Sequence, residues 1–133
     1  MAKRDLTGAV DFTHLERYTA GDAALADEVL GLFRHQTEMW LPLLSPDAPA
    51  DGWRDASHSL KGSALGIGAF ALAEACNTAE IGADTSHDAK VAQLDRIRDA
   101  VDAALADIAA WRHEQALQSL RSPERSASQR SNS

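Results

Sequence analysis

Helical periodicity runs through most of the 133-residue chain and limits its fold more than any other feature. Ala, Leu, Glu, Asp and Arg recur at the three- and four-residue spacing of amphipathic helices, and no run alternates between apolar and polar residues as a half-buried strand would. The pattern predicts helices over residues 11–19, 23–43, 50–67, 70–83 and 88–117. We therefore expect an all-α fold.

The connections between the four long helices are short, which predicts an up-down-up-down four-helix bundle with the short N-terminal helix as a cover. We place the domain at residues 10–118, after an N-terminal extension of residues 1–9. Residues 119–133 contain six serines, three arginines and almost nothing apolar, which predicts a disordered tail. Toward the core, the second helix should present a stripe interrupted only by glutamine: Leu25, Val29, Leu32, Phe33, Gln36 and Trp40.

Composition argues against several classes of function. A net charge of -7 leaves no basic surface of the kind that binds a nucleic-acid backbone, so we expect no nucleic-acid partner. The longest run of apolar residues and glycine, residues 64–73, is too short to cross a membrane, and no apolar signal core follows the first residues. We expect a soluble, cytoplasmic protein. Cys76 is the only cysteine, which excludes an internal disulfide and predicts a small buried side chain.

The last predicted helix carries many charges. Arginines are interspersed among its aspartates, and the residues concerned are Arg96, Arg98, Asp99, Asp102, Asp107 and Arg112. Opposite charges three or four residues apart stabilise an exposed helix face. We expect this face to be solvated and ion-paired.

His58 stands out on the third predicted helix because it points away from the core. With Leu60 at the centre of the buried face, a rotation of about 100° per residue puts His58 about 160° from that centre. Solvated helix faces normally carry Lys, Glu, Gln and Arg. This outer face instead carries mostly small and apolar residues, namely Asp55, Gly62, Leu65, Gly66 and Ala69. An exposed face of that composition indicates docking of a partner.

The residues that follow His58 fit a chemical role for it. Glycine inside a helix costs about 1 kcal/mol relative to alanine, and Gly62, one turn after His58, would leave room for a partner's active site to close over the imidazole. Lys61 lies on the neighbouring flank, where its ammonium would balance the charge of a phosphoryl group. Alternatively, the spacing of Gly62 and Gly66 only lets two helices approach closely, and His58 is an incidental surface residue.

Residues 58–64, His-Ser-Leu-Lys-Gly-Ser-Ala, closely resemble the phosphorylation signature of histidine phosphotransfer (HPt) domains. In that signature a histidine is followed by x-Leu-Lys-Gly and two small residues. The likeness continues through the predicted hairpin at the family's spacings, with Gly68, Ala69, Leu72, Cys76 and Glu80. Ala79 is smaller than the bulky apolar residue usual in the family, and Glu80 stands where some members have glutamine. Glu80 is therefore left out of the predicted site.

The resemblance implies a fold and a set of residue roles. The family fold is a four-helix bundle with the histidine midway along one helix, in agreement with the bundle predicted above. His58 would be the phosphoacceptor, through its outer ring nitrogen, while Lys61 would stabilise the phosphate and Gly62 would give steric access. The residues expected to contact a receiver domain are Asp55, Leu65, Gly66 and Ala69.

The implied function is that of a stand-alone phosphocarrier in a two-component phosphorelay, which takes a phosphoryl group from one receiver-domain aspartate and gives it to another. Its partners would be response-regulator receiver domains, a hybrid histidine kinase, or both. The sequence has no glycine-rich phosphate loop, so we expect no ATP-dependent kinase activity of its own. We also expect a monomer without a cofactor of its own, with Mg²⁺ supplied by the receiver domain.

Three alternative functions were also considered for this chain. A non-catalytic helical adaptor would dock receiver domains through the same face without carrying phosphate. A dimerising histidine-kinase core would have an acidic residue directly after the histidine, where this chain has Ser59. A metal site at His14, His35 and Glu38 would need the repeated, inward-facing Glu-x-x-His pairs of metal-binding bundles, which this sequence lacks.

Overall fold

The computed structural model describes residues 8–121, and this part of the chain contains helices and no strand. The α-helices are α1 (Phe12–Tyr18), α2 (Ala23–Trp40), α3 (Ala50–Ile67), α4 (Phe70–Ile81) and α5 (His87–Arg121), and a one-turn 3-10 helix, Leu41–Leu43, continues α2. A helix is found in each segment where periodicity predicts one. The predicted all-α fold is confirmed.

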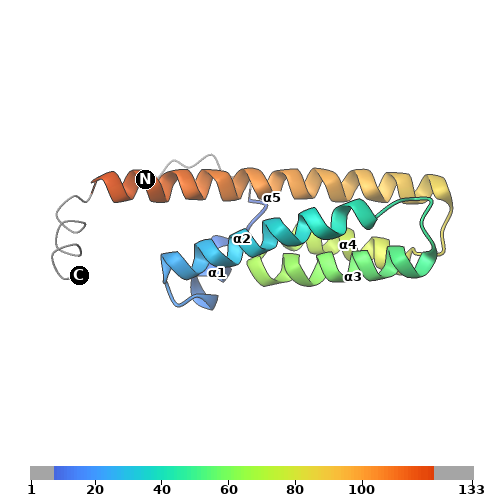
Figure 1. Ribbon diagram of the computed structural model, residues 1–133, viewed down its shortest axis with the longest axis horizontal. Coiled ribbons are helices and arrows are strands. Elements are labelled where there is room, and N and C mark those ends of the chain that lie inside the picture. The colour runs from blue at the N-terminus through green and yellow to red at the C-terminus, as the bar shows by residue number, and fades with distance from the viewer. Residues whose placement is uncertain (1–7, 122–133) are drawn as a thin grey trace.

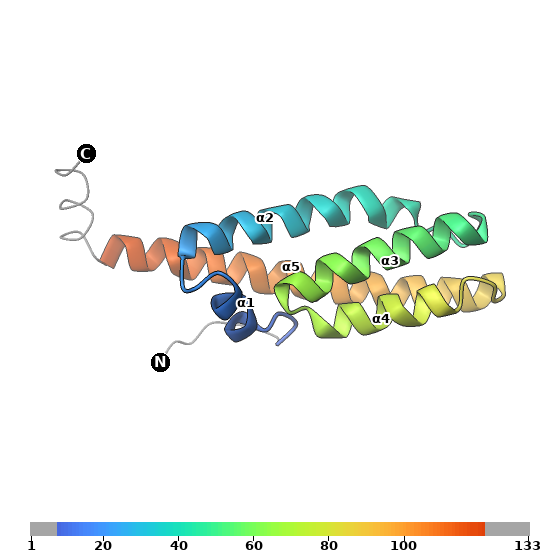
Figure 2. The same ribbon diagram turned by 90° about the horizontal axis from the view of Figure 1, so that it is seen from below.

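The four long helices form an antiparallel bundle (Figure 1). α3 packs against α2 and α4, and α5 also packs against α2 and α4, so each long helix has two neighbours. The chain runs along α2, returns along α3, runs forward again along α4 and returns along α5, while α1 lies beside the end of α3 (Figure 2). This is the predicted up-down-up-down order with a short N-terminal helix as a cover.

The turn between α3 and α4 also holds α1 in place. Gly68 ends α3 with a φ of +79°, in the left-handed region. A Cβ added at Gly68 would lie 2.9 Å from the carbonyl oxygen of Asp11, so only glycine fits this turn. The Asp11 N–H donates to the Gly68 carbonyl at 3.0 Å. The Asp11 carboxylate in turn accepts hydrogen bonds from the backbone N–H groups of Thr13 and His14, which caps α1.

The buried face of α2 differs from the predicted stripe. Leu25 and Leu32, both expected in the core, are 40% and 57% exposed. The helix carries two apolar stripes that are about 100° apart, and only one of them can face the bundle interior. The buried side chains of α2 are Ala26, Leu30, Phe33 and Thr37. The second apolar stripe is left on the surface.

Asp107 on α5 is also placed differently from the prediction. Asp99 and Asp102 are exposed as expected, but Asp107 is fully buried. Its Oδ2 accepts a hydrogen bond from the backbone N–H of Val10 at 3.1 Å. A buried carboxylate needs hydrogen-bond partners of this kind. The hydrogen bond also connects the segment before α1 to α5.

The C-terminal helix is longer than predicted, because α5 ends at Arg121 and not near residue 117. Residues 119–121 are therefore helical, and the predicted disordered tail begins too early. Residues 122–133, like residues 1–7 of the predicted N-terminal extension, lie outside the described part of the chain. Within residues 8–121, no helix combines the length and the apolar character needed to cross a membrane.

Candidate functional site

His58 lies midway along α3, on the side of the helix that faces away from the core. The predicted core residues of this helix are all buried: Trp53, Ala56, Leu60, Ala64 and Ile67. The side chain of His58 is 68% exposed. The prediction that its imidazole points to solvent is confirmed.

Glu80 on α4 connects His58 to Lys61. Its Oε2 lies 3.0 Å from His58 Nδ1, and its Oε1 lies 2.8 Å from Lys61 Nζ. Lys61 Nζ also donates to Oδ1 of Asn77, at 3.3 Å. We call His58, Lys61 and Glu80 the His58 cluster. It joins one exposed turn of α3 to the facing turn of α4.

Glu80 was named in the sequence analysis but left out of the site, although the sequence contained a signal for its place. α3 and α4 form a hairpin whose turn is at Gly68. His58 precedes this turn by ten residues and Glu80 follows it by twelve, since 68 - 58 = 10 and 80 - 68 = 12. Residues at similar distances from the turn of a helical hairpin lie opposite each other, because both helices rise equally per residue.

Charge in the His58 cluster decides which ring nitrogen is free. The hydrogen bond from Lys61 lowers the pKa of Glu80; burial opposes this effect, and the hydrogen bond with His58 adds to it. Glu80 is therefore ionised at neutral pH, and an ionised carboxylate can only accept hydrogen bonds. The proton of a neutral His58 ring must then be on Nδ1. Nε2 keeps its lone pair and is available as a nucleophile.

A buried contact fixes α4 next to the cluster. Trp53 is fully buried in the core, and its Nε1 donates to the carbonyl oxygen of Ala79 at 2.8 Å. Ala79 directly precedes Glu80 and is itself fully buried. The backbone that carries the Glu80 carboxylate is therefore anchored to the core of α3.

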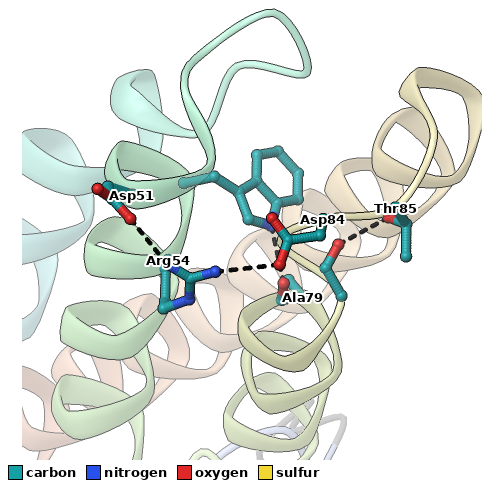
Figure 3. A network of polar contacts seen from close by, with 7 residues as sticks. Asp51, Arg54, Ala79, Asp84 and Thr85 are labelled. Atoms are coloured by element: carbon teal, nitrogen blue, oxygen red, sulfur yellow. Dashed lines mark hydrogen bonds and ion pairs between the residues drawn. The ribbon is translucent and has the colours of Figure 1, made fainter.

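An exposed ion-pair network crosses the open end of the α3–α4 hairpin (Figure 3). Arg54 lies between Asp51 and Asp84, at 2.9 Å from the first carboxylate and 3.4 Å from the second. Exposed pairs of this kind contribute about 0–1 kcal/mol. The buried Trp53 contact therefore does more than this network to hold the hairpin together.

Cys76 belongs to the interior of the hairpin. It is fully buried, as predicted. Burial raises the pKa of its thiol to about 12; the charge of Lys61 lowers this pKa by a smaller amount, and that of Glu80 raises it further. The thiol is therefore protonated at neutral pH and is a poor nucleophile.

Most of the predicted access and docking residues share the exposed side of α3, namely Asp55, Gly62, Leu65 and Gly66. A Cβ at Gly62 or Gly66 would have no neighbouring atom within 4 Å, so neither glycine is needed for helix packing. The placement of Ala69 was wrong, because this residue is fully buried. Gly68 turns the chain out of α3, and Ala69 packs inward at the start of α4.

A groove of about 340 Å³ between α2 and α3 adjoins this exposed side. Leu32 and Gln36 of α2 line it, together with Gly62 and Gly66 of α3. The exposed leucine and methionine side chains of α2 follow one another at seven-residue spacing, and we call them the α2 stripe: Leu25, Leu32 and Met39. The sequence interpretation missed this surface because it assigned the two leucines to the core.

The structure does not assemble the metal site that was set aside. Among residues 8–121 no group of three or more His, Cys, Asp and Glu side chains is placed to hold a metal ion, so His14, His35 and Glu38 do not form one. The His14 ring instead packs edge-on against Phe70, with 5.5 Å between the ring centroids.

Comparison with known proteins agrees with this arrangement. The family model of the Hpt domain matches residues 26–111, which include the whole His58 cluster. The chain is also similar to the crystal structure of the histidine phosphotransferase ShpA from Caulobacter crescentus, with 53% sequence identity, coverage of 85% of this chain and 99% of that chain, and a TM-score of 0.71. No curated protein sequence matches it. Members of the family work with receiver domains and histidine kinases in two-component relays. The chain belongs to the Hpt domain family, and its role is histidine phosphotransfer in a phosphorelay.

Proposed function

We propose that His58 is the residue that carries the phosphoryl group, on Nε2, between the aspartates of two receiver domains. The observation that supports this most directly is the 3.0 Å contact of Nδ1 with the Glu80 carboxylate on a ring that is 68% exposed. This contact occupies Nδ1 of the ring and leaves Nε2 as the nucleophile. A phosphorylated aspartate can reach this nitrogen only if the partner's active site closes over the exposed ring.

Lys61 supports the phosphoryl group in this proposal. Its ammonium is held at the edge of the cluster by Glu80 and Asn77, at 2.8 and 3.3 Å. A nearby cation stabilises the negative charge that the phosphoryl oxygens carry during transfer. The flexible stem of lysine lets the ammonium move from the carboxylate toward that charge.

Gly62 and Gly66 give the partner access, and the groove beside them gives it a docking surface. Both glycines line the groove, and Gly62 lies one turn from His58 on the same exposed side of α3, so the groove adjoins the proposed transfer site. We assign it to a helix of the receiver domain that borders the phosphorylatable aspartate. The seven-residue spacing of the α2 stripe is the spacing at which one helix packs along another. Asp55 and Leu65 would contact the receiver on the other flank.

The remaining chemistry is assigned to the partner. We propose that the receiver domain supplies Mg²⁺ and that this chain has no cofactor or ATP-dependent kinase activity of its own. Phosphoryl transfer depends mainly on positioning and on electrostatic stabilisation. One exposed nucleophile on one docking surface fits a monomer that binds one receiver at a time.

Transfer from a receiver domain tests the proposal. A panel of isolated receiver domains is loaded with labelled acetyl phosphate and mixed with the wild type, with His58→Gln and with His113→Gln, which changes an exposed histidine of α5. We expect acid-labile label on the wild type and on His113→Gln and none on His58→Gln. Equal labelling of His58→Gln would contradict the proposal. Receiver binding without transfer to any of the three proteins would support an adaptor.

A further inference from the structure

α5 has an outer face that its own bundle does not cover. The helix is 35 residues long, whereas α2 and α3 have 18 residues each. Its buried residues, from Lys90 to Trp111, lie on the side that packs against α2 and α4. On the other side, five exposed residues follow one another at seven-residue spacing, and we call them the α5 outer stripe: Ala92, Asp99, Ala106, His113 and Leu120.

The composition of this stripe is unusual for a solvated helix face, which normally carries Lys, Glu, Gln and Arg. A rotation of about 100° per residue puts Ala106 about 140° from the buried Val101. Leu120, at the far end, is 77% exposed. The stripe extends over roughly 42 Å of helix at 1.5 Å per residue. Seven-residue spacing over such a length is the spacing at which one helix packs along another.

The stripe is complementary to itself when two copies of α5 run antiparallel. Asp99 and His113 each lie seven residues from Ala106, and Ala92 and Leu120 each lie fourteen residues from it. A two-fold axis at Ala106 therefore places Asp99 opposite the partner's His113, where an imidazole N–H can donate to the carboxylate. It also places Ala92 opposite the partner's Leu120. Each of these contacts occurs twice.

A parallel pair would not be complementary in this way. It would place Asp99 against the partner's Asp99, and like charges that face each other disfavour association. In the antiparallel pair, Ala106 meets the partner's Ala106 at the axis, and small side chains at the contact let two helices approach closely. Charge and side-chain size therefore favour the same arrangement.

We propose that two copies of this chain associate through the α5 outer stripe, as an antiparallel and symmetric dimer with Ala106 at the two-fold axis. A patch that binds its own copy closes the assembly at two chains. The inference does not depend on the proposed function of His58. The monomer that binds one receiver at a time becomes one half of this dimer.

The dimer leaves both transfer sites open. α3 and α5 lie at opposite corners of the bundle, with α2 and α4 between them (Figure 1). The exposed His58 ring points outward from α3, so the two imidazoles face away from the contact between the copies. Each copy still binds one receiver, and one dimer holds two.

Sedimentation equilibrium of the full chain, over a concentration series that reaches the millimolar range, tests the dimer. Ala106→Glu sets two carboxylates against each other at the axis, and we expect it to raise the dimer dissociation constant at least about tenfold. Ala71→Glu adds the same charge at an exposed alanine of α4 and should leave this constant unchanged. A wild type that stays monomeric throughout, or a dimer that Ala106→Glu does not weaken, would overturn the proposal.

Exchange of charges tests the antiparallel register. Asp99→Arg and His113→Asp should each weaken the dimer, and the double variant should restore it, because opposite charges then face each other again. Both positions are exposed, so the fold should be retained. A double variant as weak as the single variants would contradict the register.

Transfer measurements separate the dimer from the proposed function. Ala106→Glu should take up phosphoryl groups from a receiver at the rate of the wild type, because α3 lies across the bundle from α5. Slower transfer in this variant would contradict an interface that is remote from His58. A wild type that forms the dimer but loads no phosphoryl group on His58 would overturn the proposed function and leave the dimer standing.

Discussion

Trp53 Nε1 on α3 donates a hydrogen bond to the carbonyl oxygen of Ala79 on α4, at 2.8 Å, directly before the residue whose carboxylate meets His58. The contact lies in the core, because the Trp53 side chain is fully buried. The relative position of the two helices is thus set by a buried, directional bond. The positions of His58 and Glu80 at the surface therefore depend on this contact in the interior of the hairpin.

Replacing Trp53 should therefore destabilise the fold. We expect Trp53→Phe to lower the free energy of unfolding by about 2 kcal/mol, because it leaves a cavity and removes a buried hydrogen bond. Trp40→Phe is the control, because Trp40 is only partly buried and its Nε1 bonds to Gln36 within the same helix. Urea unfolding measures both. A stability of Trp53→Phe equal to that of the wild type would contradict the anchoring role.

Gly62→Ala should stabilise the protein and impair its function. A Cβ at Gly62 would have no neighbour within 4 Å, so the variant should gain about 1 kcal/mol from helix propensity. The same methyl group would lie one turn from His58, where the partner must approach. We expect transfer from a phosphorylated receiver to slow by about tenfold.

Gly52→Ala is the matched control for this change. Gly52 lies in the first turn of α3, and a Cβ there also has no neighbour within 4 Å. Thermal unfolding and the transfer rate are compared for both variants. Stabilisation in both, with slow transfer only in Gly62→Ala, is the expected result. Equal transfer rates would show that Gly62 does not serve access.

The α2 stripe should be required for receiver docking but not for chemistry. Leu32 is 57% exposed, so Leu32→Glu should change stability by less than about 0.5 kcal/mol. We expect it to weaken receiver binding by about tenfold, because it places a charge in an apolar contact. Loading by phosphoramidate should be unchanged. Leu120→Glu, at a leucine of α5 that is 77% exposed, is the control, and an equal loss of binding in both would refute the assigned surface.

The lowered pKa of Glu80 predicts how stability depends on pH. The hydrogen bond from Lys61 is its largest cause. A carboxyl group whose pKa is lower in the folded than in the unfolded protein adds stability above the unfolded pKa, and this stability is lost as the pH falls through the folded pKa. The difference in unfolding free energy between the wild type and Glu80→Gln should therefore be largest near neutral pH and shrink on acidification. Urea unfolding over a pH series measures this difference. A difference that stays constant with pH would contradict a stabilising interaction of the ionised Glu80 carboxylate with Lys61.

The bundle could be predicted because its signals are local. Pro49 and Gly68 flank α3, and the predicted range agrees with the observed one, Ala50–Ile67. The ends of α4 and α5 were less well predicted, because no residue there forces the backbone out of a helix. The exposure of His58 followed from helical rotation alone.

The missed features depend on contacts between helices. α2 has two apolar stripes, and only its packing against α3 and α5 decides that Phe33 is buried and Leu32 is not. The burial of Asp107 depends on Val10, which is distant in sequence. The place of Glu80 depends on how the hairpin closes at Gly68. Periodicity within one helix contains none of this information.

The most direct test of the account is the intact mass of the protein after incubation with phosphoramidate, for the wild type and for His58→Gln. The variant keeps four of the five histidines, so any other phosphorylated histidine would still be detected. The account predicts one acid-labile phosphoryl group on the wild type and none on His58→Gln. Equal uptake by the two proteins, or none by the wild type when phosphoramidate and a phosphorylated receiver are both tried, would contradict it.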